Sequence, residues 1–134
     1  IETRYKINEL AHFNKKLLIS GSATQLEGQV LVIKSGINKK FPCYECVFPK
    51  TVENNLNLSC REAGILGTIT SFIGSIQVTE AIREIFRLNK HKVGKKNNFY
   101  LQKSNAEYLI LYDASLQEMS KIKLNKNLNC PTCN

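Results

Sequence analysis

The sequence contains no apolar run long enough to cross a membrane, and its first residues lack the charged and then apolar layout of a signal peptide. It also contains no internal repeat and no low-complexity tract. Secreted disulfide scaffolds usually hold an even number of cysteines, whereas this chain has five. These absences predict a cytoplasmic protein without a membrane partner. The 134 residues suffice for a single domain with a real core.

A phosphate-binding loop is absent as well. Gly64 and Gly67 do not form the G-x-G-x-x-G pattern after a strand, and no G-K-[ST] sequence occurs. Histidine occurs only as His12 and His91, and we expect both to be exposed or structural. The chain by itself therefore predicts no nucleotide site.

Acidic residues are outnumbered, with 11 Asp and Glu against 19 Lys and Arg, so the formal net charge is +8. Basic clusters can indicate an acidic partner or nucleic acid. Richness in Lys, Asn and Ile offers an alternative origin in composition alone, and no aromatic residues interleave with the clusters. We therefore do not expect nucleic acid as a partner. The clusters lie at residues 15–16, 39–40, 87–96 and 121–126.

Two C-x-x-C pairs frame the chain: Cys43 with Cys46, and Cys130 with Cys133. Four thiolates close a tetrahedral Zn²⁺ shell with no open position, which predicts a structural rather than a catalytic metal. A zinc ribbon brings its pairs together over roughly 15–20 residues, whereas residues 47–129 lie between these pairs. A shared metal would thus tie the C-terminal end to the middle of the chain. The alternative is two disulfides, or thiols that never meet.

Cys60 belongs to neither pair and is the one candidate nucleophile. It precedes a predicted helix and lies next to Arg61, and both a helix N-terminus and a neighbouring cation favour the thiolate. The alternative is a buried and inert cysteine that serves as a small apolar side chain. The preceding residues 50–59 are polar and lack periodicity, which predicts an exposed loop.

Residue periodicity predicts two helices and four strands in one domain. Gly28 lies inside one predicted strand and indicates either a bulge or a close backbone approach. The predicted helices cover residues 3–14 and 67–88, and the predicted strands cover 17–21, 25–33, 107–113 and 116–124.

The longer predicted helix carries two apolar stripes, which predicts burial on two faces. One stripe includes Ile69 and Ile73, and the other includes Ile82 and Ile85. The first face would pack on the sheet, and the second would meet either a second subunit or a second internal layer. Gly74 costs about 1 kcal/mol relative to Ala inside a helix, so we expect a close helix approach there.

Eight segments together resemble the C-terminal half of the MoeB/ThiF/HesA family, whose members are relatives of ubiquitin-activating enzymes. The block C-R-E-A-G-I-L-G from Cys60, combined with the two cysteine pairs, is the most specific part of the resemblance. The segments are residues 3–8, 20–23, 27–30, 42–49, 60–67, 74–77, 112–113 and 130–133.

The resemblance implies an α/β fold, namely the C-terminal half of a Rossmann-like activating-enzyme fold, with a mixed sheet, a long buried helix and a C-terminal end clasped by zinc. It implies an ATP-dependent adenylyltransferase that activates the C-terminal glycine of a ubiquitin-like sulfur carrier in molybdopterin or thiamin biosynthesis. It further implies a homodimer and Mg-ATP as cofactor. Zinc would be bound by Cys43, Cys46, Cys130 and Cys133, and Cys60 would carry a thioester or persulfide. Residues 50–59 would cross over the tail of the carrier.

Several departures qualify these expectations. The nucleotide-binding half has no counterpart in residues 1–134, so we expect a partial domain that is inactive alone. Ala11, Leu17, Glu45 and Thr68 replace residues that are more usual in the family, namely Cys, Pro, Arg and Pro. The alternative function is a truncated or inactive remnant that acts only as a zinc-stabilised module for binding protein or nucleic acid.

Overall fold

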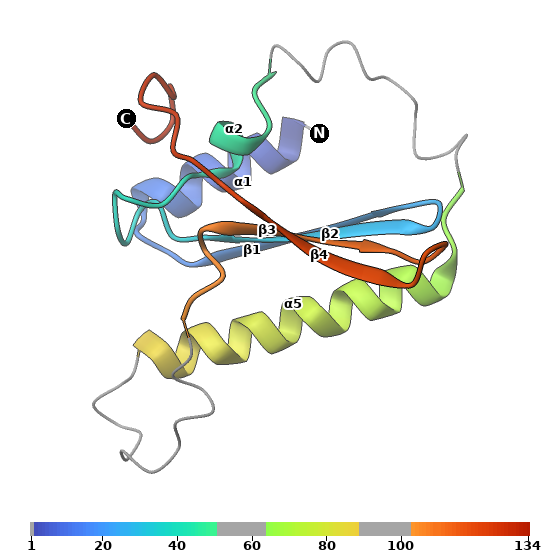
Figure 1. The fold of residues 1–134 in the computed structure, drawn as a ribbon. Coiled ribbons are helices and arrows are strands. Elements are labelled where there is room, and N and C mark those ends of the chain that lie inside the picture. Colours follow the sequence, from blue (N-terminus) through green and yellow to red (C-terminus); the bar gives the residue numbers. More distant parts are fainter. Residues whose placement is uncertain (1, 51–63, 89–102) are drawn as a thin grey trace.

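A computed structural model describes residues 2–50, 64–88 and 103–134 of the chain (Figure 1). Four strands form one sheet in the order β1-β2-β3-β4, and each strand is antiparallel to its neighbour. The strands are β1 (Leu18–Thr24), β2 (Glu27–Ile33), β3 (Tyr108–Asp113) and β4 (Glu118–Lys123).

Tight turns connect the outer strand pairs. Gln25 adopts a φ of 52° in the two-residue turn between β1 and β2, where the left-handed backbone matches the twist of the hairpin. In the turn after β3, the carboxylate of Asp113 accepts hydrogen bonds from the backbone and hydroxyl of Ser115 and from the backbone of Leu116. These bonds to the charged form lower the pKa of Asp113.

One face of the sheet is covered by α5 (Gly67–Leu88). Ile69 and Ile73 of this helix pack on Val30 and Ile110 of the two central strands. A Cβ on Gly28 would lie 2.3 Å from Cγ1 of Ile73, so this glycine lets the helix approach the sheet. The pairing register is regular at Gly28, which confirms the close approach and not the bulge.

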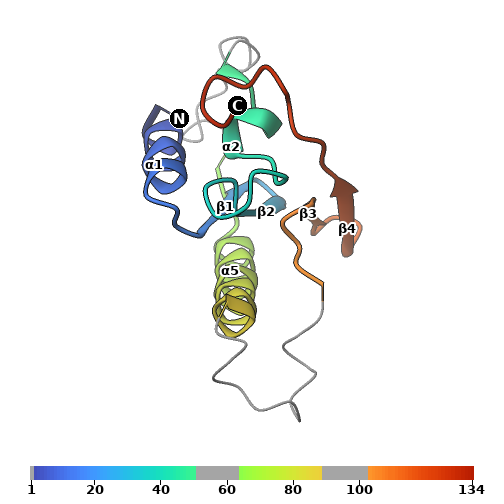
Figure 2. The ribbon, with the colours of Figure 1, turned by 90° about the vertical axis from the view of Figure 1, so that its left-hand side faces the viewer.

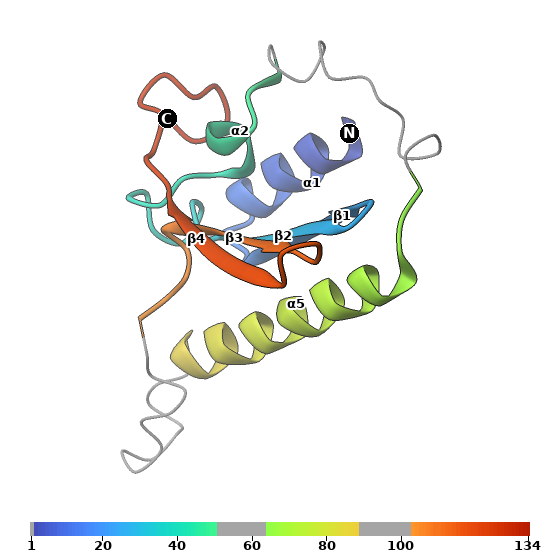
Figure 3. The ribbon, with the colours of Figure 1, turned by 45° about the vertical axis from the view of Figure 1, so that its right-hand side comes forward.

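The opposite face is covered by α1 (Glu2–Phe13), the short helix α2 (Tyr44–Val47) and the C-terminal segment (Figures 2 and 3). Tyr5 of α1 and Tyr44 of α2 join Leu31 and Leu109 in a second apolar cluster. The result is three layers, with the sheet in the middle.

Three contacts hold α1 in place. The Arg4 guanidinium donates a hydrogen bond to the backbone oxygen of Gly21 at 3.2 Å, and the Tyr5 hydroxyl donates to the backbone oxygen of Phe48 at 3.0 Å. A Cβ on Gly36 would lie 2.2 Å from the backbone oxygen of His12. The loop after β2 therefore passes directly against the end of α1.

The predicted helices and strands are confirmed, and α5 has the predicted bounds. The expected mixed sheet is wrong, because all four described strands pair antiparallel and the only parallel pairing among the described residues is the isolated bridge Gln25–Ile65. That bridge places the start of α5 at the β1–β2 turn. The helix then runs along the sheet to its other end, so β3 begins where β2 finished and returns in the opposite direction.

The second apolar stripe of α5 is exposed, which makes a second internal layer wrong for the described part of the chain. Val78, Ile82 and Ile85 expose 60%, 43% and 53% of their surface. No described atom lies within 4 Å of a Cβ built on Gly74, so the expected close helix approach is not made there. Among the helices of the described ranges, none has the length and apolar character needed to cross a membrane.

Candidate metal centre

Two short backbone turns present the four paired cysteines. Cys43 caps the start of α2, and the single helical turn brings Cys46 back to the same side. At the C-terminal end, the backbone N–H of Asn134 donates to the oxygen of Cys130, which closes a turn around Pro131 and Thr132. Each C-x-x-C spacing therefore places both of its sulfurs on one side of its loop.

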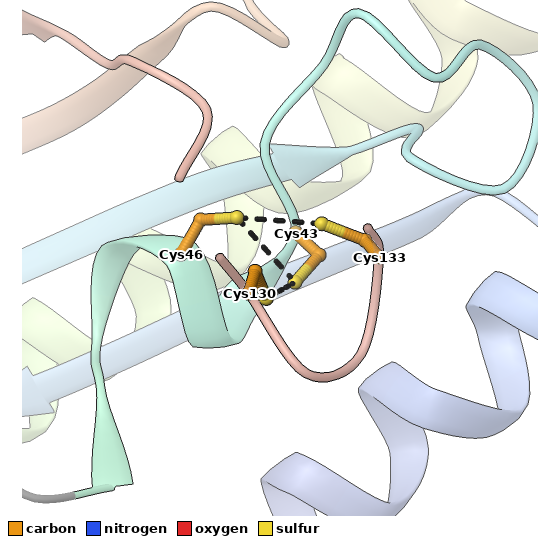
Figure 4. A group of neighbouring side chains, drawn as sticks. All are labelled: Cys43, Cys46, Cys130 and Cys133. Atoms are coloured by element: carbon orange, nitrogen blue, oxygen red, sulfur yellow. Dashed lines mark hydrogen bonds between the residues drawn. The ribbon is translucent and has the colours of Figure 1, made fainter. Parts of the chain in front are cut away.

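The four sulfur atoms point toward one another (Figure 4). The Sγ–Sγ distances are 3.8 Å from Cys43 to Cys46, 3.5 Å from Cys43 to Cys130 and 3.4 Å from Cys46 to Cys133. All four sulfurs lie within 4.8 Å of one another. A tetrahedron with Zn–S bonds of about 2.3 Å has sulfurs about 3.8 Å apart, so the spacing matches a shared metal.

All four cysteines are free thiols. Their sulfurs lie at least 3.4 Å apart in the contacts above, whereas a disulfide bond measures about 2.05 Å. The alternatives of two disulfides and of thiols that never meet are therefore wrong. The two C-x-x-C spacings predicted that these four sulfurs would lie together.

The thiols of Cys43, Cys46 and Cys133 differ in pKa. The hydrogen bond donated by Cys43 lowers the pKa of Cys46 to about 4. The same hydrogen bond, together with burial, raises the pKa of Cys43, and burial raises the pKa of Cys133 to about 12. The cluster thus favours one thiolate and resists further ionisation, because like charges would meet in a buried space. A divalent cation supplies the charge that four thiolates require.

Asn8 provides an independent test of the fit to a metal. Its side chain is fully buried, and its Oδ1 accepts the backbone N–H of Tyr44 at 2.9 Å. Its Nδ2 has no hydrogen-bond partner, although the amide lies near Cys43 and acts to lower the pKa of that thiol. A buried donor without a partner is costly, and a metal-bound thiolate at Cys43 would be its acceptor. The four cysteines and Asn8 therefore fit a zinc ion.

Aromatic rings close the space beside the sulfurs. The ring of Tyr44 meets that of Tyr5 edge-on at 5.5 Å and lies 4.9 Å from that of Phe48. Cys43, Cys130 and Cys133 expose at most 2% of their surface, whereas Cys46 is partly exposed, so water has little access to three of the four sulfurs. A closed shell of this kind suits a structural metal.

The remaining candidates from the sequence are placed as follows. Cys60, the loop at 51–59 and His91 lie outside the described residues. His12 is hydrogen-bonded through Nδ1 to the hydroxyl of Ser35 at 3.0 Å. Burial, and then the charges of Lys126 and Lys39, lower its pKa, which fits the structural role expected for it.

Sequence reasoning missed two sets of polar contacts. Asn8 lies within the predicted helix 3–14, and its separation of 36 positions from Tyr44 leaves no local signal for the bond between them. The buried carboxylates of Glu80 and Glu84 were also missed, although polar residues at i and i+4 on a buried helix face are a signal that could have identified them.

Comparison with known proteins identifies relatives of this chain. Residues 1–132 match the model of the ThiF family. The chain is 32% identical over 133 residues to the sulfur carrier protein adenylyltransferase of Thermus thermophilus, covering 98% of this chain and 44% of that protein. It is 34% identical over 134 residues to the adenylyltransferase and sulfurtransferase MOCS3 of Culex quinquefasciatus, covering 99% of this chain and 27% of that protein. The chain thus spans less than half the length of these relatives.

Solved structures share the fold at low identity. E. coli MccB with ATP matches with a TM-score of 0.69 and 10% identity, covering 99% of this chain and 36% of MccB. The heterocyclase TruD matches with a TM-score of 0.70 and 14% identity, covering 97% of this chain and 20% of TruD. These likenesses support the α/β architecture.

Proposed function

Because the chain belongs to the ThiF family, we propose that it forms the C-terminal half of an ATP-dependent adenylyltransferase that activates the C-terminal glycine of a ubiquitin-like sulfur carrier. One observation carries this proposal: 98% of the chain aligns with a sulfur carrier protein adenylyltransferase at 32% identity. In the proposed reaction, the carrier's terminal carboxylate attacks the α-phosphate of ATP and pyrophosphate leaves. Molybdopterin and thiamin biosynthesis are the pathways in which such carriers act.

In this proposal the described residues supply the scaffold. Cys43, Cys46, Cys130 and Cys133 hold a structural zinc, which clasps the C-terminal segment onto α2. The residues that bind Mg-ATP lie outside these 134 residues, since the chain carries no phosphate-binding loop. The carrier docks on this chain so that its tail reaches the nucleotide.

Cys60 is the proposed site of a thioester or persulfide, and residues 50–59 are the proposed cover over the carrier's tail. Support comes from the sequence alone, namely the C-R-E-A-G-I-L-G block and the adjacent Arg61. Labelling the chain with a thiol-reactive probe tests the idea. We expect Cys60 to react faster than the four clustered thiols of the zinc-loaded chain, and loss of that fast labelling in Cys60→Ala. Equal labelling of the variant would contradict the assignment.

A homodimer in the cytoplasm is the proposed state of the protein. The exposed stripe of Val78, Ile82 and Ile85 supports the dimer, because a second copy would bury it.

Binding of a sulfur carrier tests the proposed function directly. The zinc-loaded chain is expected to bind the carrier in calorimetry, and a carrier that lacks its C-terminal Gly-Gly serves as the matched control. We also expect no ATP–pyrophosphate exchange from the 134-residue chain with carrier. Robust exchange would contradict the placement of the nucleotide site. Absence of carrier binding, together with salt-dependent retention on immobilised DNA or RNA, would favour the alternative of a nucleic-acid-binding module.

A further inference from the structure

A contact joins the centres of the two cysteine loops. Glu45 lies between Cys43 and Cys46, and Thr132 lies between Pro131 and Cys133. The Oγ1 hydroxyl of Thr132 donates a hydrogen bond to Oε2 of Glu45 at 2.5 Å. The other oxygen of Glu45 lies 3.7 Å from the ammonium group of Lys50. The bond therefore links two loops that are 87 positions apart in the sequence.

The charge of Glu45 makes this contact informative. Four thiolates around one Zn²⁺ carry a net charge of about −2, and a carboxylate beside them adds to it. Glu45 exposes only 6% of its surface, so water solvates it poorly. A buried carboxylate is tolerated where donors satisfy it, and here the donor comes from the opposite loop. Lys50, with 61% of its side chain exposed, is a weaker partner for the same carboxylate.

We propose that Glu45 and Thr132 are positioning residues that hold the two cysteine pairs in register around the metal; this inference rests on the proposed zinc site. Groups next to metal ligands orient those ligands, and their loss typically lowers metal affinity 10–100-fold. Glu45 follows Cys43 by two residues and Thr132 precedes Cys133 by one, so each loop is fixed within two residues of a sulfur. Asn8 fixes the same region from α1, through the backbone N–H of Tyr44.

Zinc affinity of the full 134-residue chain tests the proposal, measured at pH 7 under reducing conditions by competition with a chromophoric chelator. Thr132→Val keeps the shape of the side chain and removes the donor. We expect it to bind zinc about tenfold or more weakly than the wild type. Thr132→Ser keeps the hydroxyl and is expected to retain wild-type affinity. Thr79→Val, on the exposed side of α5, is the matched control and is expected to change nothing.

A double-mutant cycle separates the contact from unrelated damage. We expect Glu45→Ala and Thr132→Val each to weaken zinc binding, and the double variant to be no weaker than the worse single variant. Additive losses, or wild-type affinity in Thr132→Val, would overturn the proposal. If Thr132→Val holds no zinc at all, wild-type affinity in Thr132→Ser supports the proposal and equal failure of both overturns it.

The same measurement separates this inference from the proposed zinc site. A wild type that binds one zinc, with Thr132→Val unchanged, refutes the positioning role and leaves the zinc site standing. A wild type that binds no zinc refutes both.

Discussion

At the scale of single residues, Glu84 of α5 is the most deeply placed charge, with none of its surface exposed. One carboxylate oxygen accepts a hydrogen bond from the ammonium group of Lys34 at 2.7 Å. The other oxygen accepts hydrogen bonds from the guanidinium group of Arg87 and the hydroxyl group of Ser104. Burial acts to raise the pKa of Glu84, but the bonds from Lys34 and Ser104 and the charges of Lys34 and Arg87 outweigh it and lower the pKa. Glu84 thus stabilises the fold in its ionised form.

Replacing this carboxylate is expected to be costly. Glu84→Gln leaves Lys34 and Arg87 without their counter-charge in a buried position, which should lower the free energy of unfolding by about 3–5 kcal/mol at pH 7. The measurement is urea unfolding of the zinc-loaded, reduced chain. Glu107→Gln is the matched control, because the side chains of Lys103 and Glu107 expose 76% and 38% of their surface and the pair should contribute less than about 1 kcal/mol.

The difference in the free energy of unfolding between wild type and Glu84→Gln should depend on pH, because the folded protein lowers the pKa of Glu84. Its contribution is present above the usual value of 4.5 and disappears as the pH falls through the lower folded-state pKa. Wild type and Glu84→Gln should therefore converge in stability below pH 4.5. A difference that stays constant down to the acid transition would contradict the assignment of the effect to the ionised carboxylate of Glu84.

At the scale of elements, two glycines lie in opposite environments, one crowded and one open. Gly36 faces the backbone of α1, where a Cβ would meet the oxygen of His12 at 2.2 Å, whereas Gly74 on α5 faces open space. Gly36→Ala should lower the free energy of unfolding by about 1–3 kcal/mol, since backbone must shift to admit the methyl group. Gly74→Ala should raise it by about 1 kcal/mol, through helix propensity.

Thermal unfolding of the two glycine variants, side by side, checks these signs. A neutral Gly36→Ala would mean that the loop after β2 does not press on α1. A destabilising Gly74→Ala would mean that a partner approaches the helix at that position.

The sequence predicted the elements well and their pairing less well. The 22 residues of α5 and the hairpin strands follow from apolar periodicity and turn residues, which are local properties. Whether β3 pairs parallel or antiparallel with β2 depends on which end of the sheet the chain reaches after α5. No local sequence pattern determines that. The cysteine spacing predicted the cluster of four sulfurs, but the bond between Asn8 and Tyr44 spans 36 positions and had no local signal.

At the scale of the whole molecule, α5 lies on one face of the sheet and the cluster of four cysteines lies on the other. The thiol cluster gathers residues from the middle and the end of the chain, beside α1. The stripe of Val78, Ile82 and Ile85 lies on the α5 side, so the proposed self-association and the proposed metal binding would use separate faces.

The separation of the two faces predicts that one can be changed without the other. Ile82→Glu should convert the proposed dimer into a monomer in sedimentation velocity, because a charge would enter the apolar interface. Ile7→Glu, at an exposed apolar residue of α1 on the opposite side of the sheet, is the control and should keep the dimer. Zinc content should be unchanged in both variants. A wild-type mass for Ile82→Glu would contradict a dimer built on this stripe.

The zinc clasp is the central claim, and metal analysis of the purified, reduced chain tests it most directly. We expect about one zinc per chain, loss of folded structure in circular dichroism when a strong chelator removes it, and recovery when zinc is restored. Cys43→Ser should lose the metal, whereas Cys60→Ser should retain it. A reduced chain that is folded and holds no metal would contradict the account.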